Sequence, residues 1–236
     1  PMIKFFRKIR QNLLLEGKTG KYFKYAVGEI VLVVIGILIA LNINNRNEFN
    51  KSYKETINNL NQVKYELEQD IAFYKNEISY SDGLLKKFKH IKQKEFDSVK
   101  VGKVFDYVST NLTIPVISNS YNKLNESGNI DIVKDSILIN SMHRYYSDNR
   151  DTYIRMAEFN SKFSSDKIEG YLIYTLELDE NLEASEASVI NELDNGKLIN
   201  LINYQSKVFE SNKQFFEFLI SQAENIITLI NEEVNN

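Results

Sequence analysis

The sequence predicts an all-α protein in which a single transmembrane helix continues into an elongated antiparallel helical bundle. One long apolar run lies near the N-terminus, the remaining apolar residues recur in steps of three and four, and no segment alternates as a strand would. With 236 residues, 43% of them hydrophobic, and no cysteine, the chain is neither a disordered tail nor a disulfide-stapled module.

Residues 1–20 form the first predicted element, a basic amphipathic helix on the cytoplasmic side. Apolar side chains such as Phe5, Ile9 and Leu13 recur on one side of it. In the plane of the inner leaflet, basic side chains next to anionic headgroups contribute roughly 1 kcal/mol each. The alternative is a helix that docks on a partner protein. The residues predicted to contact lipid headgroups are Lys4, Arg7, Lys8, Arg10, Lys21 and Lys24.

Residues 21–45 are the predicted transmembrane helix. From Ala26 to Ile43 the sequence AVGEIVLVVIGILIALNI carries a single charge. A helix rises about 1.5 Å per residue, so this run and its aromatic flank span a hydrocarbon core of about 30 Å. A buried core helix and a cleaved signal peptide are the alternatives. The run is longer than most core helices, and no small-x-small cleavage site follows Ala40.

The charges on the two flanks predict the orientation. Residues 1–24 hold seven basic residues and one acidic residue, a net charge of +6. The rest holds 22 basic residues (29 less 7) and 31 acidic residues (32 less 1), a net charge of −9. Because short basic flanks stay in the cytoplasm, residues 46–236 are predicted to be a helical domain outside the inner membrane, in the periplasm of a Gram-negative cell. Its acidic balance disfavours a nucleic-acid partner.

A row of small residues runs along one face of the predicted span. At 100° per residue, Ala26, Glu29, Val33, Gly36 and Ala40 fall within a band about 80° wide. Gly36 and Ala40 form a small-xxx-small pair, which lets two helices approach closely in lipid. We call Ala26, Val33, Gly36 and Ala40 the small-residue seam. It predicts a homo-oligomer or contact with another membrane protein.

Glu29 is the acid within this apolar stretch, on the same face as the small-residue seam. A carboxylate near the centre of a spanning helix costs roughly 2.5 to 3.5 kcal/mol on insertion scales. Three interpretations remain open at this point. The side chain snorkels toward the headgroups and Lys21 or Lys24, it makes a buried structural hydrogen bond, or it handles protons or cations.

Beyond the span, the sequence predicts a helix of about 30 residues that continues outward as a stalk. After a turn at Ser81–Gly83, a shorter helix from Leu84 to Ile91 is predicted to pair back against it. The row predicted to face the core of the long helix is Phe49, Tyr53, Ile57, Leu60, Lys64, Leu67, Ile71, Tyr74 and Ile78.

The second half of the chain predicts three further helices. A loop containing Pro115 precedes the first, which Ser118 or Ser120 caps and Gly128 ends. Asp135 caps the second, which is long. The last runs from about 197 to 234. Residues 177–192 are predicted as a loop with one or two helical turns, before a turn at 194–196. Together with the stalk, these helices predict a bundle of coiled-coil type. Residues predicted to face inward are Ile137, Met142, Tyr145, Tyr146, Tyr153, Met156, Phe159, Phe163, Leu201, Val208, Phe215, Leu219, Ile226 and Ile230.

Two stretches carry a resemblance to a known family. GKYFKYAVGEIVLVVIGILIALNINNRNE, from Gly20 to Glu48, resembles the N-terminal signature of an uncharacterised family of small single-pass membrane proteins of Bacteroidota. SYNKLNESGNIDIVKD, from Ser120 to Asp135, is similar to a motif in that family's outer domain. Arg46 stands where members often carry Trp. The resemblance implies a membrane location and a helical outer domain, and it implies no activity.

The sequence contains no motif that indicates catalysis. There is no cysteine, only His90 and His143, and no phosphate-binding glycine loop or paired acids at a recognisable spacing. We therefore expect no enzyme activity, no cofactor and no metal. The preferred hypothesis is a membrane-anchored, self-assembling periplasmic scaffold or interaction protein. The alternatives are an accessory subunit of an ion-driven or channel-like membrane complex that uses Glu29, and a sensor that signals through the N-terminal tail.

Overall fold

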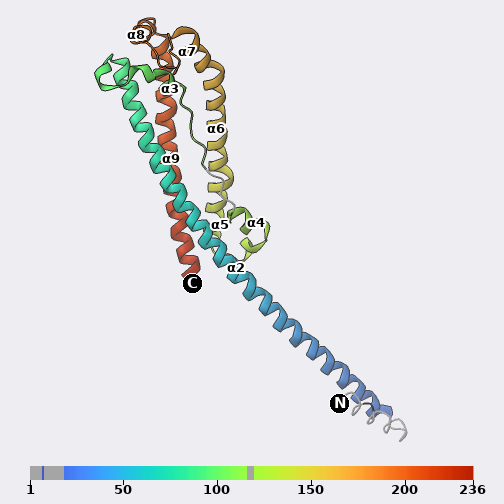
Figure 1. Ribbon diagram of the computed structural model, residues 1–236. Coiled ribbons are helices and arrows are strands. Elements are labelled where there is room, and N and C mark those ends of the chain that lie inside the picture. Colours follow the sequence, from blue (N-terminus) through green and yellow to red (C-terminus); the bar gives the residue numbers. More distant parts are fainter. Residues whose placement is uncertain (1–6, 8–18, 116–119, 236) are drawn as a thin grey trace. The chain divides into compact units, whose positions relative to one another are not determined.

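The computed structural model describes residues 7, 19–115 and 120–235, and this part of the chain is helical without a β-strand (Figure 1). The predicted all-α class is therefore confirmed. An isolated antiparallel bridge joins Leu178 and Ala184. The α-helices are α2 (Thr19–Lys92), α3 (Val104–Ser109), α4 (Ser120–Glu126), α5 (Ser136–His143), α6 (Arg150–Phe163), α7 (Gly170–Thr175), α8 (Glu186–Asp194) and α9 (Lys197–Asn235).

The chain divides into two compact units, residues 1–55 and 56–236, and α2 contributes to both. In the first unit, α2 carries an apolar 18-residue window with a mean hydropathy of 2.6, none of which is buried within the chain. Among the described residues, α2 is the one helix long and apolar enough to cross a membrane. The predicted amphipathic helix lies outside the described residues.

The predicted turn at Ser81–Gly83 is wrong, because α2 continues through it to Lys92. Gly83 lacks the positive φ that Gly128 and Gly196 adopt. Glycine inside a helix costs about 1 kcal/mol relative to alanine. Burial of the apolar side chains that follow, in phase with the preceding turns, outweighs this cost.

The core-facing row of α2 also differs from the predicted one. Its buried positions advance in alternating steps of four and three, the spacing of a helix that packs along a narrow seam. The predicted members Ile57, Lys64 and Ile71 are half-buried beside this row, and Phe49 is exposed. The prediction left out Thr56, Asp70 and Ser81, because polar residues of this kind usually lie on the surface. The buried positions are Thr56, Leu60, Val63, Leu67, Asp70, Tyr74, Ser81, Leu84, Phe88 and Ile91.

The helices from α5 to α7 follow one another without a gap, joined by the π-helical segments η4 (Arg144–Asn149) and η5 (Ser164–Glu169). The Asp135 carboxylate accepts a hydrogen bond from the Ile137 amide at 2.7 Å, so the predicted cap is confirmed. Each π-helical turn advances the chain by an extra residue and rotates the helix face that follows it.

Three predictions of burial in α5 and α6 are wrong. Ile137, Met156 and Phe159, predicted to face inward, are exposed. Tyr145 and Tyr153, predicted in the same row, are fully buried. At 100° per residue, Met156 and Phe159 lie about 60° and 120° from Tyr153 on the same helix α6, beside its buried row. Ile137 lies about 140° from the buried Met142 on α5.

Helix α9 runs antiparallel to the outer part of α2. Lys64 donates to Asn231, Lys213 contacts Asp82, and Lys92 donates to Asn203, so each advance along α2 matches an equal retreat along α9. The predicted last helix is confirmed, but its core row shifts. Leu201, Val208 and Phe215 are half-buried, whereas the buried row is Leu198, Ile202, Gln205, Phe209, Asn212, Phe216, Leu219, Ala223, Ile226 and Ile230.

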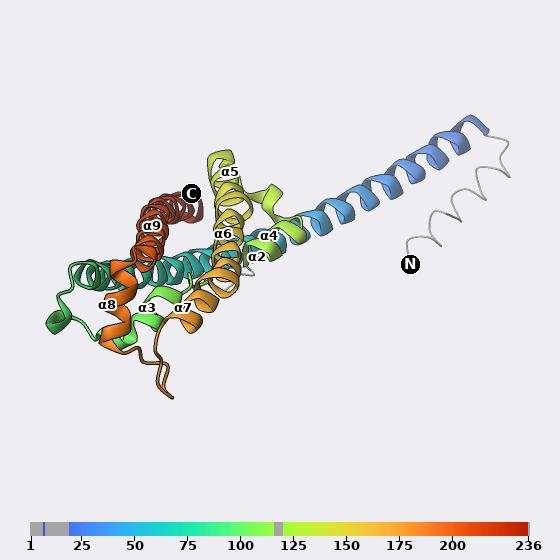
Figure 2. The same cartoon turned by 90° about the horizontal axis from the view of Figure 1, so that it is seen from above.

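A return segment connects the end of α2 with α4 and passes between α6 and α9. It contains the 3-10 turns η1 (Phe96–Ser98) and η2 (Val101–Lys103), α3, and extended residues 110–115 (Figures 1 and 2). Gln205 of α9 donates to the carbonyl oxygens of Val108 and Thr110 at 2.7 and 3.3 Å. Tyr153 of α6 donates to the carbonyl oxygen of Thr113 at 2.7 Å. The segment is therefore bonded to both long helices.

The remaining turns follow their residues. Gly128 adopts a φ of 70° after α4, before the 3-10 turn η3 (Asn129–Ile132), and Gly196 adopts a φ of 77° between α8 and α9. Both predicted turns are confirmed, because this left-handed conformation favours glycine. Helix α8 has nine residues; it begins within residues 177–192, predicted as a loop with one or two helical turns, and continues to Asp194. The Ser185 side chain caps it by accepting from the Ser188 amide.

Candidate functional site

The small-residue seam lies in the first unit, on α2. Ala26 and Glu29 are half-buried, whereas Val33, Gly36 and Ala40 are exposed. A Cβ atom built on Gly36 would meet no atom of the described chain within 4 Å, apart from its own helix. The seam is therefore open to a neighbouring helix. Of the predicted headgroup contacts, Lys24 and Arg7 are exposed, and Lys4, Lys8 and Arg10 lie outside the described residues.

A buried ion pair joins α2 to α6 in the second unit. Asp70 is 7% exposed and Arg150 3% exposed, and the guanidinium Nη1 lies 3.3 Å from the Asp70 carboxylate. The Tyr145 hydroxyl donates to the same carboxylate oxygen at 2.9 Å. Tyr74 extends the network, because its hydroxyl lies 3.2 Å from that of Tyr145. The network thus connects the middle of α2 to the π-helical segment η4.

The protonation of this network follows from its burial. Burial raises the pKa of Asp70 above 3.8, although Arg150 and the Tyr145 hydrogen bond lower it in part. Burial also raises the pKa of Tyr74 to about 12 and that of Tyr145 well above 10. Both phenols are therefore protonated at neutral pH and act as hydrogen-bond donors. The arrangement suits alignment of α2 with α6, because the donors of Arg150 and Tyr145 hold the Asp70 carboxylate within the core.

Residues around α4 form a second polar contact between elements. The Glu66 carboxylate of α2 accepts from the Ser120 amide at 3.3 Å and from its hydroxyl at 2.6 Å. Tyr121 stacks on Tyr146 with ring centroids 4.8 Å apart and lies 3.3 Å from His143 Nδ1. The start of α4 therefore links α2 to the C-terminal end of α5 and to η4.

An apolar groove lies between α6 and α9, with the return segment as its floor. It has a volume of about 490 Å³. Each wall presents residues at helical steps of three, four and seven. The α6 wall contains Thr152, Arg155, Met156, Phe159 and Asn160, the α9 wall Tyr204, Lys207, Val208 and Ser211, and the floor Leu112.

Three residues predicted to be in the core line this groove, namely Met156, Phe159 and the half-buried Val208. Met156 is 40% exposed and Phe159 is 68% exposed. Phe159 stacks on Phe163, with ring centroids 6.4 Å apart, and Phe163 packs on Tyr204 at 4.7 Å. Phe163 thus meets α9 through Tyr204, whereas Met156 and Phe159 stay exposed on the α6 wall. The groove is not predictable from the sequence, because no local pattern places residues 110–115 between α6 and α9.

The charged side chains of the groove are both basic. No Asp or Glu is among its lining residues. Arg155 donates to the Thr152 hydroxyl at 3.1 Å, and no carboxylate of the described chain lies within ion-pair distance of it. Lys207 pairs with Glu210 at 3.4 Å, where both side chains are exposed. Asn160 is 3% exposed, and its Nδ2 has no hydrogen-bond partner in the described chain.

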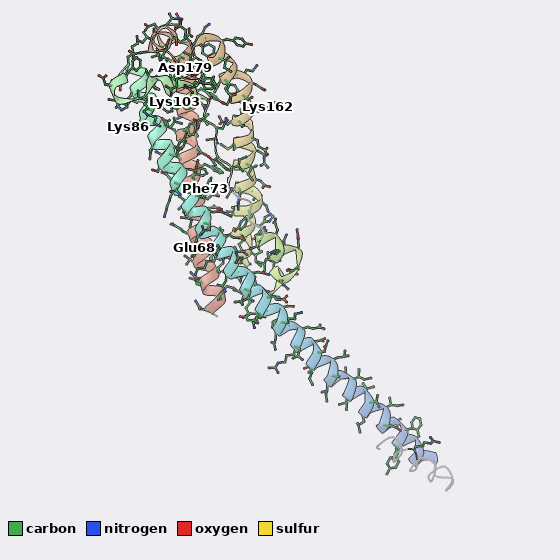
Figure 3. The ribbon with its side chains drawn as sticks, viewed as in Figure 1. Glu68, Phe73, Lys86, Lys103, Lys162 and Asp179 are labelled. Carbon is green, nitrogen blue, oxygen red and sulfur yellow. The ribbon has the colours of Figure 1, made fainter. Side chains whose placement is uncertain are left out.

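Within the described residues, no cluster of three or more His, Cys, Asp or Glu side chains could hold a metal ion. His90 lies 2.7 Å from Glu95 at the end of α2. Phe73 of α2, labelled in Figure 3, packs edge-on against Phe216 of α9 with centroids 6.1 Å apart. Phe216 is fully buried and also stacks on Tyr74, so these aromatic side chains fill the bundle core.

One protein-family profile matches the chain. It is described as a family of unknown function (DUF6090), and it covers residues 29–207. The match includes the apolar part of α2, the ion pair and the α6 wall of the groove. No curated protein and no solved structure matches the chain.

Proposed function

The chain belongs to the family of unknown function DUF6090, and on that premise we propose that it is a membrane-anchored, non-catalytic helical interaction protein. The N-terminal part of α2 anchors it in the inner membrane, and residues 46–236 form a periplasmic scaffold. The chains assemble through the small-residue seam. Lipids and further copies of the chain are its first partners.

The apolar window of α2 carries this proposal. None of that window is buried within the chain, although its mean hydropathy is 2.6. Apolar surface left in water costs roughly 25 cal/mol per Å², so a helix of this composition requires lipid or protein around it. The basic residues before it and the acidic balance after it favour a cytoplasmic N-terminus.

The absence of cysteine allows a direct topology test. Lys24→Cys and Lys51→Cys place single thiols on either side of the apolar window, at exposed positions. We expect a membrane-impermeant maleimide to label Lys51→Cys in cells with a permeabilised outer membrane, and Lys24→Cys only after lysis. Equal labelling of both variants before lysis, or recovery of the chain in the soluble fraction, would refute the anchor.

Self-assembly has its own test, the mass of the full chain in nanodiscs by native mass spectrometry. Gly36→Leu combined with Ala40→Leu should reduce the oligomer, because large side chains prevent close helix approach. Gly28→Leu is the matched control, since it lies about 120° from the middle of the row at 100° per residue. An oligomer that survives the double substitution, or that Gly28→Leu disrupts equally, argues against the seam.

Glu29 favours a second candidate, an accessory subunit of an ion-driven or channel-like membrane complex. The observation is its place on the face that carries the seam, where assembly would gather one carboxylate per chain. Glu29→Gln should abolish ion-dependent activity in the host, and Glu29→Asp should retain part of it. A Glu29→Gln strain that behaves like wild type removes this candidate and leaves the anchor untouched.

A further inference from the structure

We propose that the groove between α6 and α9 binds the alkyl chain of an anionic, single-chain amphiphile, such as a long-chain fatty acid or a lysophospholipid. The inference goes beyond the proposed anchor and scaffold, and it rests on the second unit alone. Three properties of the groove carry it: its size, its lining and its charge.

The size fits a small ligand. The volume of about 490 Å³ lies within the range of roughly 300 to 1,000 Å³ typical of small-molecule sites. The groove is lined by ten residues, whereas a stable protein interface engages roughly 20 to 30 residues on each side. A protein partner would need a surface well beyond the groove.

The lining fits an alkyl chain. Leu112 forms the floor, Met156 and Phe159 stand on the α6 wall, and Val208 stands on the α9 wall. These side chains lie along the helix axes, because α6 and α9 present them at successive turns. Met and Phe remain exposed at 40% and 68%, so an alkyl chain that lies along the groove removes apolar surface from water on both partners.

The charge selects an anionic headgroup. Arg155 and Lys207 line the groove from opposite walls, and no carboxylate lines it. Within the described part of the chain, the Arg155 guanidinium donates to the neutral Thr152 hydroxyl and forms no ion pair. A guanidinium presents several donors in a planar fork that matches a carboxylate or a phosphate. Arg155 is therefore the headgroup contact, and Lys207 adds positive potential.

Asn160 adds a polar group to the apolar lining. Its Oδ1 accepts from the Leu112 amide at 3.4 Å, so the side chain is fixed against the floor. Its Nδ2 is buried and has no hydrogen-bond partner within residues 19–115 and 120–235. A buried donor without an acceptor is unfavourable. Because this atom is closed off from solvent, it makes no contact with a ligand in the groove, and Arg155 remains the headgroup contact.

Photocrosslinking tests the proposal on the full chain. The protein is placed in nanodiscs of phosphatidylcholine, and the probe is hexadecanoic acid that carries a diazirine on its chain. We expect saturable crosslinks in residues 150–163 and 204–211, and competition by hexadecanoate at least tenfold better than by hexadecanol. Crosslinks confined to residues 23–45, which report bulk lipid, or equal competition by the alcohol, would overturn the proposal.

Competition also identifies the source of the ligand. Displacement by hexadecanoate identifies a free fatty acid, and stronger displacement by lysophosphatidate identifies a lysolipid; either supports the groove. Displacement by neither anion overturns it. A dimer whose formation blocks the crosslink, and which Met156→Asp dissociates, assigns the groove to a second copy and also overturns the proposal.

Matched variants localise the effect. Met156→Asp should reduce crosslinking at least tenfold, because it places a carboxylate in the apolar wall. Arg155→Gln should remove the preference for the acid over the alcohol. The controls are Phe218→Asp, an exposed apolar position of α9 outside the groove, and Lys162→Gln, an exposed position of α6 (Figure 3). With helicity unchanged, wild-type crosslinking by Met156→Asp contradicts the proposal.

Discussion

The substitution Arg150→Met should destabilise the second unit by leaving the Asp70 carboxylate without its cation. Arg150 and Asp70 are almost fully buried, and they lie 3.3 Å apart. Removing one partner of a buried pair typically costs about 3 to 5 kcal/mol. For a unit of this size, 1 kcal/mol shifts Tm by about 2 to 4 °C, so the expected decrease is about 6 to 20 °C. Thermal unfolding of the full chain, followed by circular dichroism, measures it.

The pH dependence of this loss identifies Asp70 as its cause. Burial already raises the pKa of Asp70, and Arg150 opposes that rise. Without Arg150 the folded-state pKa rises further. A carboxyl group with a raised folded-state pKa contributes stability that is present below the unfolded pKa, about 3.8, and is lost as the pH rises through the folded value. The deficit of Arg150→Met should therefore be smaller at about pH 4.5 than at about pH 8.

A second substitution and a control complete the test. Asp70→Asn combined with Arg150→Met removes both charges and keeps an acceptor for the Tyr145 hydroxyl. It should recover most of the lost stability and remove the extra pH dependence. Lys162→Met, at an exposed position of the same helix, should change stability by less than about 0.5 kcal/mol. A deficit that is the same at both pH values, or a double variant no more stable than Arg150→Met, refutes the reasoning.

Five further substitutions test the packing and the helix ends of the bundle by denaturant unfolding. Gln205→Leu should cost about 1 to 3 kcal/mol, because two backbone carbonyls of residues 108–110 lose a buried donor; an unchanged midpoint would contradict that role. Gly83→Ala should stabilise α2 by about 0.5 to 1 kcal/mol, whereas Gly128→Ala, at a φ of 70°, should destabilise the protein by about 1 to 2 kcal/mol. If both substitutions changed the stability in the same direction, the backbone conformation of the glycine would not determine the effect. Asp135→Ala should cost about 1 kcal/mol through the lost cap of α5, and Asp135→Asn should retain most of it.

Local signals predicted much of the helical framework. The caps and stops at Asp135, Gly128 and Gly196 were read directly, because each depends on residues adjacent in sequence. The apolar run of α2 was predicted for the same reason, since composition alone defines it. The turn at Ser81–Gly83 failed because a local glycine signal is weaker than burial in phase with a long helix.

The core rows were predicted less well. Asp70, Gln205 and Asn212 occupy core positions that a hydrophobic pattern assigns to the surface. Asp70 is buried because Arg150, 80 residues away, reaches it, and Gln205 because it donates to the return segment. Such partners are distant in the chain, so no local window contains them.

By itself, the sequence determined the helical class, the apolar stretch of α2, the charge asymmetry around it and the main helix ends. These depend on composition and on interactions within a few residues of each other. The tertiary structure alone decided which polar residues enter the core, and it opened the groove in which Met156 and Phe159 stay exposed. The physical reason is that the buried polar residues find their partners in distant parts of the chain, and that the return segment lies between α6 and α9. Both effects arise from how distant segments pack.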